Sequence, residues 1–232
     1  MALAVVYSRA QLGIESPLVT VEVQLGGGLP GTSIVGLAET AVKESKDRVR
    51  GALKNLKFGY PQTKVTINLA PADLPKEGGR FDLPIALGIL AAIGSVPHDL
   101  LREMEFIGEL ALTGGVRSVS GVLPAAIAAH NEQRSIVIPN HNKEEAALLQ
   151  EASIYHAANL MDICQHLNGG ASLPKTSTRL LPAAYSPSLK LSDIRGQFTA
   201  KRALQIAAAG GHNVIFIGPP GTGKTMLASR LP

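Results

Sequence analysis

Short apolar runs alternate with longer amphipathic segments along the first 170 residues. Residues 16–25 alternate apolar and polar positions with period two, and residues 64–71 and 134–139 are β-branched runs that end at proline. All of them predict strands. The spacing of apolar residues predicts helices over 38–57, 82–93 and 121–133. This mixture of strands and helices predicts an α+β fold.

Glycine-rich segments punctuate this pattern. A Gly-Gly pair separates two strand-like runs within 105–119, which predicts a hairpin with a two-residue turn. Residues 26–31 (GGGLPG) are interpreted either as a turn between strands or as a mobile binding loop. Residues 76–82 place four charges around a glycine pair. This density favours a ligand or intersubunit contact, and the alternative is a plain N-terminal cap by Asp82 for the next helix.

The composition changes after the first 170 residues. Residues 171–191 are rich in Pro, Ser and Thr and lack periodicity, which predicts a linker. It would separate a first domain, 1–170, from a second segment, 192–232. In the second segment we expect a helix over 200–209, a fully apolar strand over 212–218 and another helix from 226.

Composition limits the possible classes of function. The 232 residues are 45% hydrophobic and 17% charged, which supplies a core and excludes a disordered chain. The longest uncharged stretch, the 16 residues 83–98, is broken by proline and glycine and is shorter than the ~20 residues of a membrane span. A single cysteine, Cys164, excludes an internal disulfide and a cysteine-based zinc site, and we expect it in the core. No leader is evident, so we expect a cytoplasmic protein, and the net charge of +4 permits an anionic partner.

The strongest chemical motif follows the predicted strand 212–218. It matches GxxxxGK[ST], in which glycine backbone N–H groups converge on phosphate oxygens before a helix begins. We expect Lys224 to reach the β- and γ-phosphates of ATP and Thr225 to complete the coordination of Mg²⁺. The nucleotide-binding residues predicted in this way are Gly218, Pro219, Pro220, Gly221, Thr222, Gly223, Lys224 and Thr225.

Residues 193–228 (DIRGQFTAKRALQIAAAGGHNVIFIGPPGTGKTMLA) resemble the opening of the AAA+ module of magnesium-chelatase-subunit-like ATPases. The resemblance implies ATP and Mg²⁺ as cofactors, the first helix, strand and P-loop of a P-loop AAA+ α/β domain, and a place beside the adenine for Ile194 and Gln197. Such a module continues with an acidic residue, sensors and an arginine finger that this chain lacks. We therefore expect a truncated chain that does not hydrolyse ATP alone, and an AAA+ ATPase in the full-length protein.

Residues 5–55 and 67–92 extend the resemblance to ComM/YifB-type proteins over essentially the whole chain. Chelatase subunits proper begin near their AAA+ module, so the additional N-terminal domain argues against metal insertion. The resemblance implies a hexameric homo-oligomer that uses ATP to drive branch migration of DNA during recombination in natural transformation. It implies no membrane as a partner. A chelatase-type or protein-remodelling ATPase with no DNA role is the alternative.

The first domain also resembles the proteolytic domain of Lon-type proteases, which has a ribosomal S5 domain 2-like fold and a Ser-Lys dyad. Residues 75–82 match the segment around the serine and residues 107–129 the segment around the lysine, which places Arg80 and Leu123 at the two catalytic positions. A guanidinium cannot serve as the nucleophile and leucine offers no base, so we expect an assembly or DNA-contact module without peptidase activity. The serines that a shift in register would bring to the nucleophile position are Ser118 and Ser120.

A helix over 38–57 would carry its basic residues within a sector of about 80°, beside an apolar sector that we expect to be buried. This basic stripe is interpreted either as a line of contacts to DNA phosphates or as an ordinary solvated face, since Glu39 and Asp47 border it. The residues of the basic stripe are Lys43, Lys46, Arg50, Lys54 and Lys57.

Overall fold

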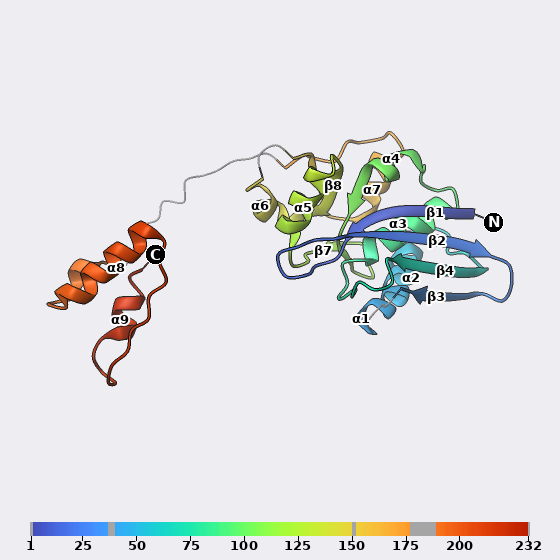
Figure 1. Ribbon diagram of the computed structural model, residues 1–232. Coiled ribbons are helices and arrows are strands. Elements are labelled where there is room, and N and C mark those ends of the chain that lie inside the picture. The colour runs from blue at the N-terminus through green and yellow to red at the C-terminus, as the bar shows by residue number, and fades with distance from the viewer. Residues whose placement is uncertain (1, 37–39, 150–151, 177–188, 232) are drawn as a thin grey trace. The chain divides into compact units, whose positions relative to one another are not determined.

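The computed structural model describes residues 2–36, 40–149, 152–176 and 189–231. The chain divides into two compact units, Met1–Leu180 and Leu181–Pro232 (Figure 1). Each unit is described on its own below. No helix in the described ranges combines the length and apolar character that crossing a membrane requires.

The first unit is built on a mixed sheet of mostly parallel pairs. Strand β1 pairs antiparallel with β2 and β2 antiparallel with β4, whereas the pairs β1–β5, β3–β4, β5–β8 and β8–β9 are parallel. The order across the sheet is β3-β4-β2-β1-β5-β8-β9. The strands are β1 (Ala2–Arg9), β2 (Leu18–Gly26), β3 (Gly31–Val35), β4 (Lys64–Ala70), β5 (Met104–Phe106), β8 (Ser135–Pro139) and β9 (Ile154–Ala157).

The alternation along β2 explains how the sheet is covered. Val19, Val21 and Val23 are fully buried, and the residues between them are partly exposed. Strand β4 has the same pattern, with its odd-numbered residues from 65 to 69 buried. A register slip of one residue would turn these apolar sets toward solvent, so one covered face fixes the pairing. The strands predicted over 16–25, 64–71 and 134–139 are confirmed as β2, β4 and β8.

Helices α2 and α3 lie behind β1, β2 and β4 in Figure 1. Every residue of α3 is buried, and a Cβ atom at Gly88 would lie 2.5 Å from Val23 Cγ2, so the helix approaches the sheet closely where it has no side chain. The predicted helices 82–93 and 121–133 are confirmed as α3 and α5, and the prediction over 38–57 becomes two helices that meet at Glu44. The helices of the first unit are α1 (Thr40–Lys43), α2 (Ser45–Asn55), α3 (Asp82–Ala92), α4 (Asp99–Glu103), α5 (Val122–Asn131), α6 (Lys143–Ala146) and α7 (Leu160–Leu167), with a 3-10 turn, η1 (Asn140–Asn142).

The hairpin expected within 105–119 has a longer turn than the Gly-Gly pair suggested. Strand β6 (Glu109–Leu110) pairs antiparallel with β7 (Val116–Arg117), and the Ala111 N–H donates to the Gly115 carbonyl at 2.9 Å. Gly114 has a φ of +87°, which suits glycine, but the turn also includes residues 112 and 113. The turn type was therefore predicted wrongly although the hairpin was placed correctly.

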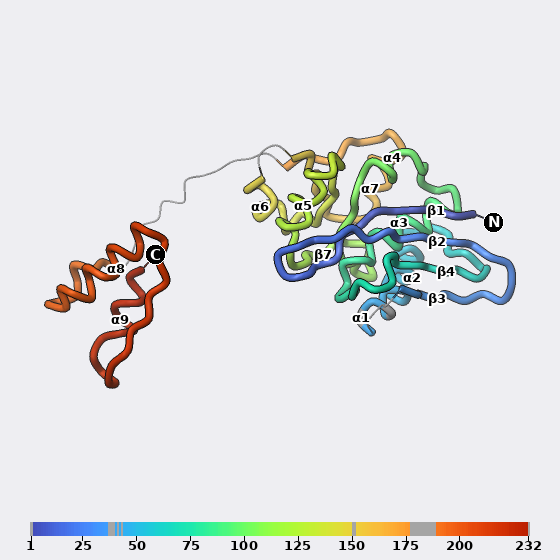
Figure 2. The backbone as a smooth tube through the Cα atoms, in the orientation of Figure 1, coloured from blue at the N-terminus to red at the C-terminus, as the bar shows by residue number. Residues whose placement is uncertain are grey.

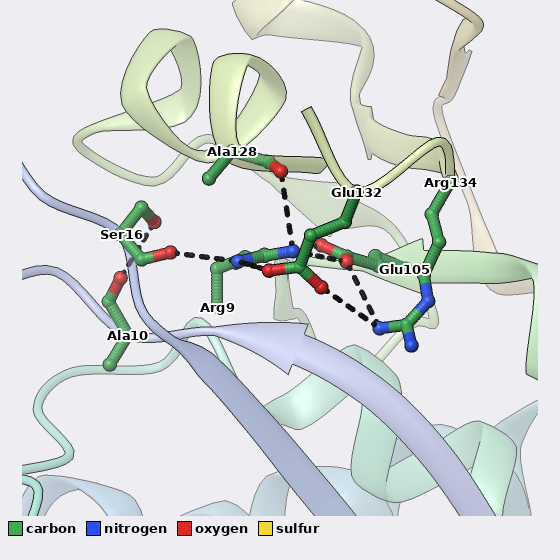
Figure 3. Close-up of polar contacts among 7 residues, drawn as sticks. All are labelled: Arg9, Ala10, Ser16, Glu105, Ala128, Glu132 and Arg134. Atoms are coloured by element: carbon green, nitrogen blue, oxygen red, sulfur yellow. Dashed lines mark hydrogen bonds and ion pairs between the residues drawn. The ribbon is translucent and has the colours of Figure 1, made fainter. Parts of the chain in front are cut away.

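A buried cluster of charges joins β1, β5 and the end of α5 (Figure 3). The Arg9 guanidinium donates through Nε and Nη2 to the two carboxylate oxygens of Glu105, at 2.7 and 2.6 Å, and through Nη1 to Glu132 at 2.9 Å. Arg134 lies 3.5 Å from both carboxylates and stacks on the Tyr7 ring, 4.2 Å from its centroid. Each of the two buried groups, Arg9 and Glu105, therefore has a partner of opposite charge, as burial requires.

The first unit extends into the segment that the sequence assigned to the linker. Leu173 is buried in the main core, the His156 N–H donates to the Pro174 carbonyl, and the Thr176 N–H donates to the Ile154 carbonyl. Residues 173–176 thus run beside β9. The remaining linker residues 177–188 lie outside the part of the chain that the structure describes.

The second unit has a small core. Helix α8 (Phe198–Gly210) confirms the helix predicted over 200–209, and α9 (Lys224–Ala228) begins earlier than expected. Ile194, Leu204 and Leu227 form the hydrophobic cluster of this unit, next to a 3-10 turn, η2 (Leu191–Asp193), and Ala207 of α8 is buried as well. Residues 212–218 follow the extended path between α8 and α9 in Figure 2 without strand pairing. The predicted strand is therefore not formed, and Ile215 and Ile217 are 81% and 87% exposed because no strand in the described part of this unit pairs with them.

Candidate functional site

The glycine-rich loop 218–223 leads directly into α9. Gly221 and Gly223 have φ values of +82° and +83°, a region that residues with a Cβ atom rarely adopt. A Cβ atom at either glycine would meet nothing within 4 Å, so the loop backbone is open on the side where these side chains would stand. The loop therefore leaves room for a ligand to approach its backbone.

Lys224 folds back over this loop. Its Nζ donates to the carbonyls of Gly218 and Pro219 at 2.8 and 2.7 Å, and the Thr222 hydroxyl donates to the Pro219 carbonyl at 2.9 Å. The Lys224 ammonium thus lies against the backbone carbonyls at the start of the loop. Thr225 follows in the first turn of α9 and is exposed. An ammonium, a free hydroxyl and glycine backbone N–H groups are a donor set that fits a chain of phosphates.

The two residues expected beside the adenine lie in different settings. Gln197 is exposed and adopts a φ of +52°, and its Nε2 donates to the Thr222 carbonyl at 3.4 Å, which brings it to the P-loop. Ile194 is buried against Leu204 and Leu227. The structure thus brings Gln197 to the predicted nucleotide site and gives Ile194 a packing role.

The basic stripe follows one side of α2. Lys46, Arg50 and Lys54 are exposed at intervals of one helical turn, and Lys57 is exposed just after the helix. The Arg50 guanidinium lies 5.5 Å from the centroid of the Tyr60 ring. Glu39 and the side chain of Lys43 fall outside the part of the chain that the structure describes. The apolar sector of the helix is buried as expected, through Val49, Ala52 and Leu53.

The two positions that the Lon resemblance assigns to a peptidase dyad make other contacts. Arg80 is buried and donates through Nη2 to the Ser120 carbonyl at 2.6 Å, and Leu123 is half-buried at the start of α5. The Ser120 hydroxyl donates to Gln11 Oε1 at 2.9 Å. Ser118, Ser120 and Arg80 line one cavity, together with Gln11 and Glu109, which no local sequence signal identified.

The charged loop 76–82 is explained in part by packing. Asp82 does not cap α3, because its carboxylate accepts from Arg48 Nε at 2.7 Å and from the Leu110 N–H at 3.1 Å. Burial raises the pKa of this carboxyl, and the hydrogen bonds from Arg48 oppose that rise. The capping role is therefore wrong, whereas Glu77 and Arg80 of the same loop do line the cavity.

Family models match both parts of the chain. The model described as subunit ChlI of Mg-chelatase matches residues 21–142, from β2 through η1, which is more than half of the chain. The chain belongs to the ChlI family of Mg-chelatase subunits. A second model of this family, described as magnesium chelatase, subunit ChlI, matches residues 190–232 and so includes the P-loop.

Relatives of this ChlI-family chain include bacterial proteins of greater length. The chain is 55% identical over 235 residues to competence protein ComM of Haemophilus influenzae and 49% identical over 233 residues to the protein YifB of Escherichia coli. Both alignments cover all of the chain and 46% of the relative, so the chain spans about half the length of these relatives. A weaker similarity, 28% identity over 144 residues, covers 59% of the chain and 17% of the Lon protease of Chlamydia trachomatis.

Proposed function

We propose that this chain is the N-terminal portion of a cytoplasmic AAA+ ATPase that binds ATP with Mg²⁺ at residues 218–225. The observation that carries the proposal is the complete GPPGTGKT loop, with two glycines at positive φ and Lys224 over the loop carbonyls. The match of residues 190–232 to a ChlI model supports it.

In this proposal Lys224, Thr225 and Gln197 have separate roles. The Lys224 ammonium exchanges its two carbonyl acceptors for phosphate oxygens, which are stronger partners because they are charged. The Thr225 hydroxyl and the phosphates hold Mg²⁺, which neutralises charge on the nucleotide. Gln197, already hydrogen-bonded to the loop, lies against the base.

Lys224→Ala tests the nucleotide site. Binding of a fluorescent ATP analogue to this chain, and ATP hydrolysis by the full-length protein, should both be lost. Arg202→Ala removes an exposed positive charge from α8 in the same unit and should leave both unchanged. Normal turnover by Lys224→Ala would refute the assignment.

We further propose that the full-length protein is a homo-hexamer that drives branch migration of DNA, like the ComM-type proteins it resembles. The first unit would be a Lon-like, ribosomal S5 domain 2-like module that has lost the Ser-Lys dyad and serves assembly or DNA contact. Support comes from the 55% identity to ComM, from the weaker similarity to Lon protease, and from the exposed basic stripe on α2.

The salt dependence of binding tests the DNA contact. If Lys46, Arg50 and Lys54 contact phosphates, replacing all of them with Gln should weaken binding to a labelled four-way junction and reduce the slope of log K against log salt by about 1 per lost contact. A control in which Lys143, Lys175 and Arg202 become Gln changes the net charge equally and should leave the slope close to wild type. Equal slopes of log K against log salt in the two variants would show that the basic stripe is an ordinary solvated surface and not a line of DNA contacts.

The second candidate function is a chelatase-type or protein-remodelling ATPase with no DNA role, which the ChlI matches favour. ATP hydrolysis by the full-length protein distinguishes the two. Stimulation by branched DNA that requires Lys224 supports the DNA motor. Turnover that requires Lys224 but ignores DNA supports the chelatase-type or remodelling function.

A further inference from the structure

The first unit contains a cavity of about 670 Å³ that the proposed ATPase function does not use. Its walls come from segments far apart in the chain: residues 11–13 of the hairpin that connects β1 with β2, the loop 77–80 before α3, Glu109 of β6 and the loop 118–120 before α5. A volume of this size is typical of sites for small molecules or short peptide segments.

Arg80 is a buried cation in the wall of this cavity. It is 5% exposed, and its Nη2 donates to the Ser120 carbonyl at 2.6 Å, while its Nη1 has no hydrogen-bond partner. Among the residues that the structure describes, no carboxylate lies within ion-pair distance of this guanidinium. Burial lowers the pKa of Arg80, and no acidic group opposes that shift.

The other deeply buried arginine of the first unit differs from Arg80 in its partners. Arg9 has the bidentate carboxylate of Glu105 and a second carboxylate from Glu132. Arg80 has only a neutral carbonyl. An unpaired buried cation is costly, so a structure that retains one beside an open cavity is suited to an anion that enters from outside.

The cavity walls indicate which anion fits. Glu109 lies so close to Gly79 that a Cβ atom there would be 2.6 Å from its Cγ, and Glu77 lines the cavity as well. These two carboxylates repel a doubly charged phosphate more strongly than a singly charged carboxylate. The Arg117 guanidinium, 3.2 Å from Glu109, offsets only part of this charge.

The β1–β2 hairpin beside the cavity adds an apolar surface. Leu12 lines the cavity and is exposed, and Ile14 at the hairpin tip is 92% exposed. The Leu12 and Glu15 backbones pair with each other, at 2.9 and 3.0 Å, which fixes the shape of the tip. A ligand whose carboxylate meets Arg80 would thus have an apolar surface close by for an adjoining side chain.

We propose that this cavity binds the C-terminal carboxylate of a peptide whose last side chains are apolar, with Arg80 as the cation that receives the carboxylate. Recognition of a chain terminus would be a binding activity of the first unit. It does not depend on the proposed nucleotide site.

Nuclear magnetic resonance of the ¹⁵N-labelled chain tests this proposal with N-acetyl-alanyl-leucyl-leucine as the probe. We expect saturable shifts of the backbone amides of Gly78, Gly79 and Ser120. The same peptide with a C-terminal amide should bind more weakly by a factor of about ten or more, because it loses the charge-assisted hydrogen bond. Acetate, which has the charge without the leucines, should also bind more weakly than the acid peptide.

Variants separate Arg80 from the general charge of the surface. Arg80→Met should weaken binding of the acid peptide about tenfold or more and leave the amide peptide unchanged, whereas Arg117→Met should keep the preference for the acid. The spectrum of Arg80→Met shows whether it folds, and the comparison of the two peptides on the wild-type chain needs no variant. Equal binding of acid and amide peptides, no saturable shift at millimolar peptide, or tighter Arg80-dependent binding of inorganic phosphate would each overturn the proposal.

Discussion

Removal of the Arg9 guanidinium should strongly destabilise the first unit. Arg9→Met keeps most of the length and apolar stem of the side chain but removes the guanidinium that holds both oxygens of Glu105. Glu105 is fully buried, and its remaining cationic neighbour is Arg134 at 3.5 Å. Breaking a buried ion pair from one side typically costs about 3–5 kcal/mol, because the other charge stays buried without its partner.

Urea unfolding followed by circular dichroism measures this loss. With an m-value of about 2 kcal/mol/M, a loss of about 4 kcal/mol lowers the midpoint by about 2 M. Arg117→Met, which removes an arginine from the exposed pair with Glu109, is the matched control and should cost less than about 1 kcal/mol. The double variant Arg9→Met with Glu105→Leu should recover much of the loss, because it leaves no unpaired charge. A loss below about 1 kcal/mol for Arg9→Met, or a double variant as unstable as the sum of the single changes, would refute the reasoning.

Three further outcomes follow from packing and burial. Gly88→Ala should lower the free energy of unfolding by about 1–3 kcal/mol in the same urea assay because the new methyl group would overlap Val23, whereas Gly27→Ala, where nothing lies within 4 Å, should cost less than about 1 kcal/mol. Burial raises the pKa of Cys164 to about 12, so this thiol should resist Ellman's reagent at pH 8 in the folded chain and react once urea unfolds it; rapid reaction of the folded chain would contradict its burial. Asn142→Ala should lower the free energy of unfolding by about 1–3 kcal/mol and speed hydrogen exchange in the loop before α5, because the Asn142 side chain hydrogen-bonds both the N–H and the C=O of Val119. Unchanged exchange would show that the loop keeps its shape without these hydrogen bonds.

The elements that the sequence predicted well are those with a long local signal. Helix α3 is apolar throughout and begins at Asp82, and β2 alternates over its length, so pattern alone places both. Strand β9 has four residues and no alternation, and it is a strand because Ile154–Ala157 pair with β8. Pairing of this kind depends on residues far away in the chain, which local patterns do not contain.

The candidate sites differ in the same way. The proposed nucleotide site is a motif of eight consecutive residues, so a linear pattern is sufficient to propose it. The cavity around Arg80 joins a hairpin, two loops and Glu109; the sequence indicated its loop 76–82 by density of charge and Ser118 and Ser120 by the Lon resemblance, but gave no local signal for Gln11 or Glu109. The prediction of a strand over 212–218 was wrong for a related reason, because a strand needs neighbouring strands to pair with and local apolar character does not supply them.

The position of α3 in the chain bears on how the protein is made. A helix that is apolar on every side is poorly stable in water alone and is an aggregation hazard until it is covered. The elements that it packs against include β1, β2 and α2, which precede it in the sequence, and β6, which follows it. During synthesis from the N-terminus, the part of the surface that β1, β2 and α2 provide has therefore left the ribosome before α3 does, which shortens the time for which its eleven residues are fully exposed.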